Sequence, residues 1–253
     1  MSAAALDLCI PRPGQTWSET QLASVNPCLE NRSATERVQW ALDYLPRPAI
    51  LSSSFGAQSA VMLHMISSAK ADIPVVFIDT GYLFPETYRF VDELTARLNL
   101  DLRIYRAGIS PAWQEARYGK LWEEGVKGIE QYNQVNKVEP MKKALSELRA
   151  GSWFSGLRRS QSESRKNIDI LQAHGDVVKV HPIADWSDRD VHFYLKDHDL
   201  PYHPLWEQGY VSIGDYHSSS PLSADTTAEQ SRFSGLVREC GLHEPQRYVA
   251  ANS

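Results

Sequence analysis

The amino-acid sequence predicts an α/β fold in which helices cover both faces of a twisted parallel sheet. Short apolar segments at residues 49–51, 73–78 and 102–105 are typical of buried strands. Segments with helical spacing, at residues 58–69 and 85–98, alternate with them. In a sheet of this βαβαβ order the crossovers are right-handed, and ligands bind in the crevice at the carboxyl ends of the strands.

The flanking elements follow from similar signals. A leading helix is expected at residues 35–45, because apolar residues repeat there at helical spacing and Pro46 and Pro48 follow. Ser187 and Asp190 have the spacing of a capping box, which satisfies the first amides of a helix. The remaining predictions are a mostly helical region at 113–149, strands at 152–157 and 179–183, and a helix from Ser187 to about residue 199.

Composition excludes several classes of protein. The 253 residues include 26 Lys and Arg against 31 Asp and Glu, a net charge of −5, which argues against broad electrostatic contact with nucleic acid. Cys9, Cys28 and Cys240 are far apart and form no Cys-x-x-Cys pair, so neither a disulfide framework nor a cysteine metal site is expected. The eight histidines form no known set of metal ligands. Because signal-peptide and membrane-span patterns are also missing, we expect a soluble cytoplasmic protein without a bound metal.

Composition also divides the chain into four parts. Residues 1–45 are interpreted as a helical lead-in and residues 46–217 as a nucleotide-binding α/β domain. Residues 218–231 are rich in small polar residues and contain no aromatic or basic residue, which is typical of a flexible linker. The final arm, residues 232–253, regains apolar and charged residues and contains Cys240. We therefore expect the linker to deliver a thiol to another part of the protein.

The segment from Ser52 to Gln58 offers three consecutive serines and Gly56 between a predicted strand and a predicted helix. Hydroxyl and backbone donors at the positive end of a helix dipole suit a phosphate or sulfate group. The Walker A pattern and its lysine are absent, so nucleotide hydrolysis of that type is not expected. The alternative interpretation is an ordinary serine-rich turn.

Two other polar segments follow predicted strands. Asp79, Thr80 and Gly81 could hydrogen-bond a ribose or a base in the crevice, or could instead form a turn and a helix cap. Residues 158–166 contain four basic residues and one acid, and arginine side chains match the geometry of phosphate groups. The alternative there is a solvated basic loop.

Cys240 is the candidate nucleophile. Arg238 and His243 flank it and would stabilise the reactive thiolate, and Gly241 leaves room for a bulky electrophile. The alternative is a structural cysteine, which is less expected in an arm that follows a polar linker. Cys9 and Cys28 lie in no comparable pattern and are interpreted as bystanders.

Five segments, in order, resemble the phosphoadenylyl-sulfate (PAPS) reductases of sulfate assimilation, of the bacterial thioredoxin-dependent type. The similarity extends over about residues 35–244. Its most specific segments are LSSSFGAQ at 51–58, DTGYLFPETY at 79–88, GLRRSQS at 156–162, YHPLW at 202–206 and RECGLH at 238–243. The resemblance implies an adenine nucleotide α-hydrolase-like fold, related to the ATP pyrophosphatases.

Similar reductases that use adenylyl sulfate hold a [4Fe-4S] cluster on four cysteines. The positions that match those cysteines are Tyr132, Asn133, Asp215 and Ser218, and none of them supplies a thiolate. The resemblance therefore implies the cluster-free branch, with no bound cofactor. It also implies PAPS as the substrate, and the basic residues at 158–166 suit its additional 3′-phosphate.

The resemblance further implies a mechanism, in which Cys240 attacks the sulfur of PAPS and becomes S-sulfocysteine. Lys137, Arg158 and Arg159 offset the charge of the departing adenosine 3′,5′-bisphosphate. Thioredoxin or glutaredoxin then releases sulfite, and the family is commonly a homodimer. The substrate-binding residues that the resemblance implies are Ser52, Ser53, Ser54, Gly56, Gln58, Asp79, Thr80, Gly81, Lys137, Arg158, Arg159, Gln161, Arg165, Tyr210, Arg238 and His243.

Three alternatives stay open on the sequence alone. A cluster-free adenylyl-sulfate reductase would share the chemistry but not require the 3′-phosphate. An ATP pyrophosphatase-like adenylyltransferase is disfavoured, because the S-G-G-x-D-S form of the loop is absent and the arm with Cys240 would have no role. A regulatory nucleotide-binding module with an inert thiol would bind a nucleotide without forming a covalent adduct.

Overall fold

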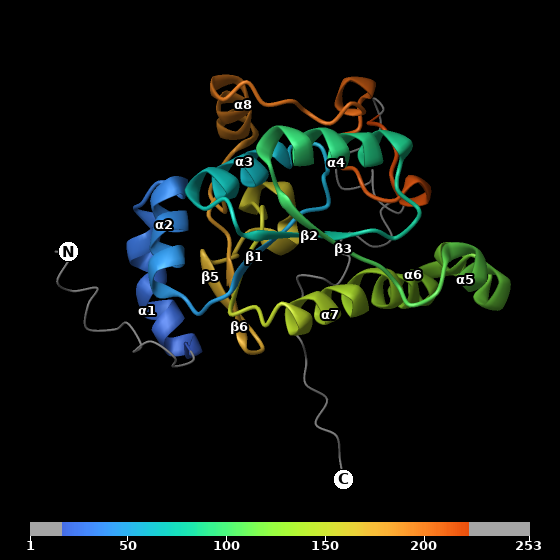
Figure 1. Ribbon diagram of the computed structural model, residues 1–253, viewed down its shortest axis with the longest axis horizontal. Helices are drawn as coiled ribbons and strands as arrows, with labels where there is room; N and C mark the ends of the chain where they lie inside the picture. The colour runs from blue at the N-terminus through green and yellow to red at the C-terminus, as the bar shows by residue number, and fades with distance from the viewer. Residues whose placement is uncertain (1–16, 223–253) are drawn as a thin grey trace, which may run out of the picture.

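A central sheet of six strands organises the computed structural model, which describes residues 17–222. The strands are β1 (Ala49–Ser52), β2 (Pro74–Ile78), β3 (Asp101–Tyr105), β4 (Ser152–Phe154), β5 (Leu171–His174) and β6 (Val177–Val180). Their order across the sheet is β3-β2-β1-β4-β6-β5 (Figure 1). Neighbouring strands are parallel except at the edge, where β5 runs antiparallel to β6.

Helices cover both faces of this sheet, as predicted (Figure 1). They are α1 (Glu19–Glu30), α2 (Ala34–Tyr44), α3 (Ala60–Ala69), α4 (Pro85–Leu98), α5 (Pro111–Tyr118), α6 (Gly125–Asn133), α7 (Glu139–Glu147) and α8 (Asp188–Asp197). In Figure 1, α3 and α4 lie along one face and α7 along the other.

Alternate strand residues point into two separate cores. Leu51 and Phe154 belong to the larger core, which also contains buried residues of α1, α2, α3, α4 and α8. Ile50 and Trp153 face the opposite side, where Met141 of α7 packs against them. Side chains on a strand alternate between its two faces, so the short apolar strands can be buried on both sides.

Helix α1 protects the edge of the sheet at β5. The buried Asn26 side chain donates a hydrogen bond to the Leu171 carbonyl at 3.0 Å and accepts one from the Leu171 amide at 2.8 Å. These two bonds satisfy backbone groups that an edge strand would otherwise leave unpaired.

Most predicted elements lie close to their expected positions. The helix predicted at residues 85–98 is α4, and the leading helix predicted at 35–45 is α2, one residue earlier. The capping box predicted at Ser187 and Asp190 is present at the start of α8. Strand β6 begins two residues before the predicted position, because Val177 and Val178 are buried as well.

Two elements have no counterpart among the predictions. The antiparallel strand β5 has the sequence LQAH, which is too short and too mixed to predict a strand. Helix α1 contains Pro27, which obscures the helical pattern, although Ser18 and Gln21 form a capping box at its start. The sheet is therefore mixed at one edge, where an all-parallel sheet was expected.

The region predicted as mostly helical, residues 113–149, is divided into several pieces. Gly119 directly follows helix α5 and Gly125 begins helix α6, and both glycines have a positive φ angle. Between α6 and α7 the segment Gln134–Val138 is a π-helix, and it contains Lys137. Such segments are frequent at functional sites.

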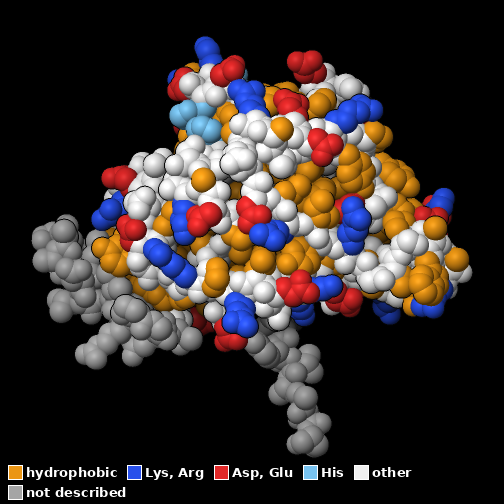
Figure 2. Space-filling model, viewed as in Figure 1, with side chains coloured by type: hydrophobic (Ala, Val, Ile, Leu, Met, Phe, Trp, Pro, Cys, Tyr) orange, Lys and Arg blue, Asp and Glu red, His pale blue; other side chains and the backbone are white. Residues whose placement is uncertain are grey.

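The surface shows no large region of one charge on the face seen in Figure 2, where acidic and basic side chains are interspersed. Hydrophobic side chains gather toward the right of that view, the side on which Figure 1 places α5 and α6. Trp113 and Tyr118 of α5 and Val126 of α6 are large exposed hydrophobic residues. No helix among residues 17–222 is both long and apolar enough to span a membrane.

Candidate active site

The first part of the candidate site is the serine loop, residues Ser52 to Gln58, at the carboxyl end of β1. The indole Nε1 of Trp153 donates a hydrogen bond to Ser52 Oγ at 2.6 Å. The Phe55 amide donates to Ser53 Oγ at 3.1 Å, and the Phe55 ring is fully buried with φ at 49°. Internal contacts therefore fix the course of this loop, while Ser54 is exposed.

Helix α3 follows the serine loop, and it begins at Ala60, two residues later than predicted. Ser59 precedes it and forms no side-chain cap. Gly56 packs near the backbone of a later segment, where a Cβ atom would lie 3.4 Å from the Ile213 carbonyl oxygen. The arrangement retains the strand, serine loop and helix that the sequence predicts for an anion site.

The second part is the basic segment, residues 158–166, which follows β4. Arg158 is almost completely buried, with a side chain only 5% exposed. Its Nη2 group donates to Gln58 Oε1 at 2.7 Å and to Asp188 Oδ1 at 2.9 Å. The structure thus brings the predicted residues Gln58 and Arg158 into direct contact.

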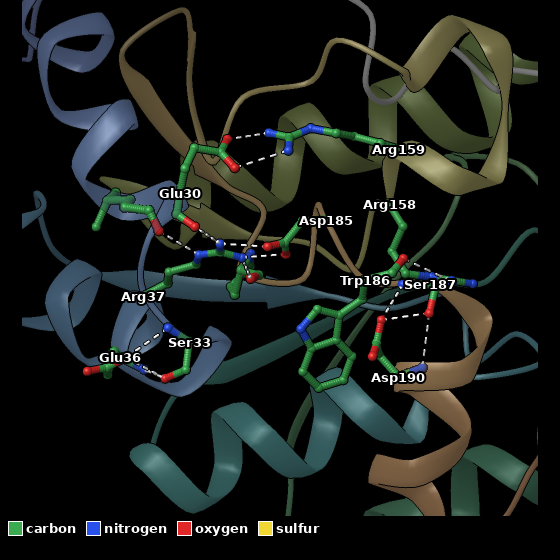
Figure 3. A network of polar contacts seen from close by, with 12 residues as sticks. Glu30, Ser33, Glu36, Arg37, Arg158, Arg159, Asp185, Trp186, Ser187 and Asp190 are labelled. Carbon is green, nitrogen blue, oxygen red and sulfur yellow. Dashed lines mark hydrogen bonds and ion pairs between the residues drawn. The ribbon is translucent and has the colours of Figure 1, made fainter.

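Arg158 and Arg159 point apart, although they are adjacent in the sequence (Figure 3). Arg159 binds the Glu30 carboxylate with both terminal nitrogens and the Ile168 carbonyl with Nε. The hydrogen bond to Glu30 is the main reason why the pKa of Arg159 is raised. Arg159 is therefore directed toward α1, whereas Arg158 is directed toward the start of α8.

Gln161 connects two of the predicted cations. Its Oε1 atom accepts from the Arg158 amide at 3.1 Å and from Arg165 Nη1 at 2.6 Å. Both Gln161 and Arg165 lie in short 3₁₀ turns, so the predicted loop has a defined course.

The third part is the Asp79 loop, residues Asp79 to Gly81, at the carboxyl end of β2. Asp79 Oδ1 accepts from the Gly81 amide at 2.9 Å and from the Tyr88 hydroxyl at 2.7 Å. Asp79 Oδ2 accepts from Arg106 Nε at 2.7 Å. Gly81 has φ at 76°, and a Cβ atom there would lie 2.4 Å from Pro111 Cγ, so only glycine fits.

A buried polar network lies behind the Asp79 loop. The Thr80 hydroxyl donates to Asp215 Oδ1 at 2.5 Å, and Lys137 Nζ lies 2.7 Å from Asp215 Oδ2. Burial would raise the pKa of Asp215, but attraction to Lys137 and the hydrogen bonds from Lys137 and Thr80 lower it to about 2. Two predicted binding residues, Thr80 and Lys137, are therefore held by one ionised carboxylate.

Comparison with models of protein families matches residues 48–221 to the phosphoadenosine phosphosulfate reductase domain. The matched segment contains the serine loop, the Asp79 loop, Lys137 and the basic segment. The chain belongs to this reductase family.

Several individual proteins show the same relationship. A phosphoadenosine 5′-phosphosulfate reductase of Shewanella oneidensis is 57% identical over 243 residues, covering 96% of this chain and 99% of the relative. One of Vibrio cholerae serotype O1 is 62% identical over 224 residues and covers 88% of each chain. This chain therefore has nearly the same length as its named relatives.

Solved structures confirm the adenine nucleotide α-hydrolase-like fold. The crystal structure of a phosphoadenylyl-sulfate (PAPS) reductase from Candida auris, a phosphate complex, matches with a TM-score of 0.71 and 30% identity, covering 81% of this chain and 99% of that chain. An FMN adenylyltransferase of Candida glabrata matches with a TM-score of 0.56 and 14% identity, covering 88% of this chain and 78% of that chain. The second likeness concerns the fold alone.

The four positions that match cluster cysteines in similar reductases lie at buried sites. Tyr132, Asn133, Asp215 and Ser218 are each at most 5% exposed. Rings pack around them, and His217 stacks on the Trp122 ring at 3.9 Å between centroids. None of the four side chains is a thiolate. Among residues 17–222, no group of three or more His, Cys, Asp or Glu side chains could hold a metal ion.

Other predicted residues lie near this site or outside the described part of the chain. Tyr210 packs against Phe84 at 5.5 Å between ring centroids, in a cluster with Ala57 of the serine loop. Cys28 is a free, half-buried cysteine in α1. The residues outside the described range 17–222 are Cys9, Arg238, Cys240 and His243.

The start of the predicted linker is packed on the protein. Ser218 is buried, and its amide and hydroxyl both donate to the Asp215 carbonyl. The Leu222 amide donates to the Gly209 carbonyl at 2.9 Å. The linker predicted at 218–231 stays a prediction, because residues 223–231 lie outside the described part of the chain.

Sequence reasoning missed three residues that organise the site: Trp153, Asp215 and Arg106. Arg106 had a detectable signal, because a basic residue directly after a predicted strand lies at the carboxyl edge of the sheet. Trp153 could be predicted only as a buried strand residue. Asp215 was identified only as a position that lacks a cluster cysteine, and its ion pair could not be predicted, since its partners Thr80 and Lys137 are distant in sequence.

Proposed function

We propose that this chain reduces PAPS to sulfite and adenosine 3′,5′-bisphosphate in assimilatory sulfate reduction. The observation that carries the proposal is the family match over residues 48–221, which includes all three polar segments at one edge of the sheet. Relatives named for this activity are 57–62% identical over nearly the whole chain, which favours PAPS over the adenylyl-sulfate and adenylyltransferase alternatives.

In this proposal the carboxyl edge of the sheet positions the substrate. The serine loop and the start of α3 bind the phosphosulfate group through hydroxyl and amide donors. Arg158, held by Gln58, supplies a fixed guanidinium beside that loop. The Asp79 loop receives the nucleoside, and Lys137 offsets negative charge behind it. Positioning the sulfuryl group against one nucleophile is the main contribution of these residues.

Cys240 is the proposed nucleophile. Its thiolate attacks the sulfuryl sulfur, a sulfur–sulfur bond forms, and the bond from that sulfur to the bridging phosphate oxygen breaks. The electron pair of the broken bond leaves with adenosine 3′,5′-bisphosphate. The enzyme then carries S-sulfocysteine, and Arg238 and His243 would favour the reactive thiolate of the next cycle.

A dithiol protein, thioredoxin or glutaredoxin, completes the proposed cycle. One of its thiolates attacks Cys240 Sγ and expels sulfite, and its second thiol resolves the mixed disulfide, so the partner is oxidised by two electrons. This exchange requires a reducing compartment, which agrees with an expected cytoplasmic location. We further expect a homodimer with no bound cofactor.

Intact mass spectrometry tests this proposal. The reduced protein is mixed with PAPS, and separately with adenylyl sulfate, without a dithiol partner. We expect one sulfonate adduct with PAPS, and we expect Cys240→Ser to abolish both the adduct and sulfite release while it still binds adenosine 3′,5′-bisphosphate. Cys28→Ser is the control and should retain the adduct.

Two results would contradict the proposal. Sulfite production by Cys240→Ser would exclude Cys240 as the nucleophile. Binding of PAPS without any adduct on the wild-type protein would favour the regulatory or adenylyltransferase alternatives. Equal labelling by both nucleotides would leave the chemistry intact and exclude a requirement for the 3′-phosphate.

A further inference from the structure

Arg106 lies at the carboxyl edge of the sheet, directly after β3, and has no role in the function proposed above. Its Nε atom donates to the Asp79 carboxylate at 2.7 Å. The Asp79 side chain is only 7% exposed, whereas the Arg106 side chain is 66% exposed. An exposed guanidinium is therefore anchored at one nitrogen by a buried carboxylate.

The anchor itself is firmly held. Asp79 Oδ1 accepts from the Gly81 amide and from the Tyr88 hydroxyl, so the carboxylate is bonded from three sides. Burial and the hydrogen bond to Asp79 raise the pKa of Tyr88, which keeps its hydroxyl a donor. No residue among 17–222 accepts a hydrogen bond from either Nη group of Arg106. These two nitrogens form a fork that is oriented before any ligand arrives.

The location of this fork suits one part of a nucleotide. The strand order places β3 beside β2 and two strands from β1, about 10 Å away at ordinary strand spacing. In the proposed function the 5′-phosphosulfate lies at the serine loop after β1 and the nucleoside at the Asp79 loop after β2. A nucleoside at the Asp79 loop would lie beside β3, so a 3′-phosphate directed to that side would approach Arg106.

The cations of the basic segment are held differently. Arg158 is 5% exposed and binds Gln58 and Asp188, and Arg159 binds Glu30. Arg165 donates to Gln161. Each of these guanidinium groups would have to exchange or share a protein partner to bind another phosphate. Arg106 can bind a phosphate with its two terminal nitrogens while its Nε atom stays hydrogen-bonded to Asp79.

We propose that Arg106 binds the 3′-phosphate of the substrate and makes the enzyme prefer PAPS to adenylyl sulfate. A guanidinium fork with two available N–H donors matches a terminal phosphate geometrically. This inference rests on the proposed function, because it takes its substrate and the placement of the nucleoside from there. It differs from the expectation that the additional phosphate binds to the basic segment.

Calorimetry with two product nucleotides tests the role of Arg106. Adenosine 3′,5′-bisphosphate and adenosine 5′-monophosphate are titrated into the wild type, Arg106→Gln, Arg106→Lys and Arg103→Gln. Arg103 is the matched control, because it lies on β3, three residues before Arg106, and pairs with Asp101. We expect Arg106→Gln to weaken binding of the bisphosphate about 10- to 100-fold, the range for a lost charge-assisted contact. Binding of the monophosphate should change less than about twofold, and Arg106→Lys should be intermediate.

Either of two results would overturn the inference. An unchanged affinity of Arg106→Gln for the bisphosphate would show that the 3′-phosphate lies elsewhere. An equal loss for both nucleotides would show that Arg106 only shapes the Asp79 loop. A different result would contradict the proposed function, namely that the wild type forms no sulfite from PAPS. Even then, the ratio of the two nucleotide affinities would decide whether Arg106 binds a 3′-phosphate.

Discussion

The two sides of the carboxyl edge of the sheet stabilise their charges in opposite ways. On the β2 side, Asp215 is buried and ionised, and it holds Thr80 and Lys137 inside the protein. On the β4 side, Arg158 and Arg159 pair with the more exposed carboxylates Asp188 and Glu30. Buried ion pairs are costly to break, whereas exposed pairs contribute little to stability.

This difference predicts different consequences for substitutions on the two sides. Removing a group of the Asp215 network should destabilise the fold, because several buried polar atoms depend on that carboxylate. Removing an acidic partner on the β4 side should leave the fold nearly intact and change how a guanidinium is presented to substrate. The two sides therefore call for different measurements.

The largest expected effect is the loss of stability in Asp215→Ala. The substitution removes the carboxylate that contacts both Thr80 and Lys137 in the protein interior. Removing one partner of a buried ion pair costs about 3–5 kcal/mol of stability. This corresponds to a fall in Tm of about 10 °C in a protein of this size. Thermal unfolding followed by circular dichroism measures it.

Asp188→Ala is the matched control for Asp215→Ala. Asp188 also pairs with a buried cation, Arg158, but its own side chain is 79% exposed. We expect a loss of at most about 1 kcal/mol. If the two variants unfolded at similar temperatures, the contrast between the sides would be wrong. The double variant Asp215→Leu with Lys137→Met should be more stable than Asp215→Ala alone, since it leaves no buried charge.

The order of strands and helices around the site could be predicted from the sequence, because each element has a local pattern. The helix at α4 and the capping box at Ser187 are determined by residues close together in the chain. Strand β5 could not be predicted, since its stability depends on pairing with β6 and on Asn26 of the distant α1. Local patterns cannot reveal an element that only tertiary contacts stabilise.

The candidate site shows the same limit. The serine loop, the Asp79 loop and the basic segment were predictable as polar segments after strands. Their internal partners were not, because Asp215 lies 135 residues from Thr80 and Arg158 lies 100 residues from Gln58. The sequence thus predicts which segments meet at the edge of the sheet. It does not predict that Arg158 and Arg159, adjacent in the chain, point in different directions.

Protonation of buried histidines, His181 above all, should destabilise the protein at a higher pH than protonation of Asp215, an effect of intermediate size. His181 follows β6 and is fully buried, with Nδ1 accepting from Ser155 and Nε2 donating to Gln172. Burial, and then the positive charges of Lys179, Arg165 and Arg159, lower its pKa to about 3. As the pH falls, the unfolded state therefore binds a proton at this histidine at a higher pH than the folded state does. Stability that is present above pH 6.5 is lost as the pH falls toward 3, by up to about 1.4 kcal/mol per pH unit.

Urea unfolding between pH 7.5 and 4.5 measures this dependence. We expect the slope of the unfolding free energy against pH to be smaller in His181→Gln than in the wild type. Some slope should remain, because burial also lowers the pKa of His174 and of His203 to about 4. Asp215→Asn should leave the slope in this range unchanged, since an aspartate with a lowered pKa loses its contribution only below its ordinary value of 3.8. A wild-type slope equal to that of His181→Gln would contradict the assignment.

The smallest expected effect concerns Glu30, which holds Arg159 away from Arg158 (Figure 3). Because both side chains of the pair are partly exposed, Glu30→Gln should cost at most about 1 kcal/mol in stability. If Arg159 stays directed toward α1 during turnover, Glu30→Gln should change the KM for PAPS less than about twofold. Arg158→Met should raise this KM about tenfold or more. A clear fall in KM in Glu30→Gln would mean that Glu30 competes with the substrate for Arg159. In that case Arg159 would bind PAPS as the resemblance implies, and the two arginines would act together after leaving different protein partners.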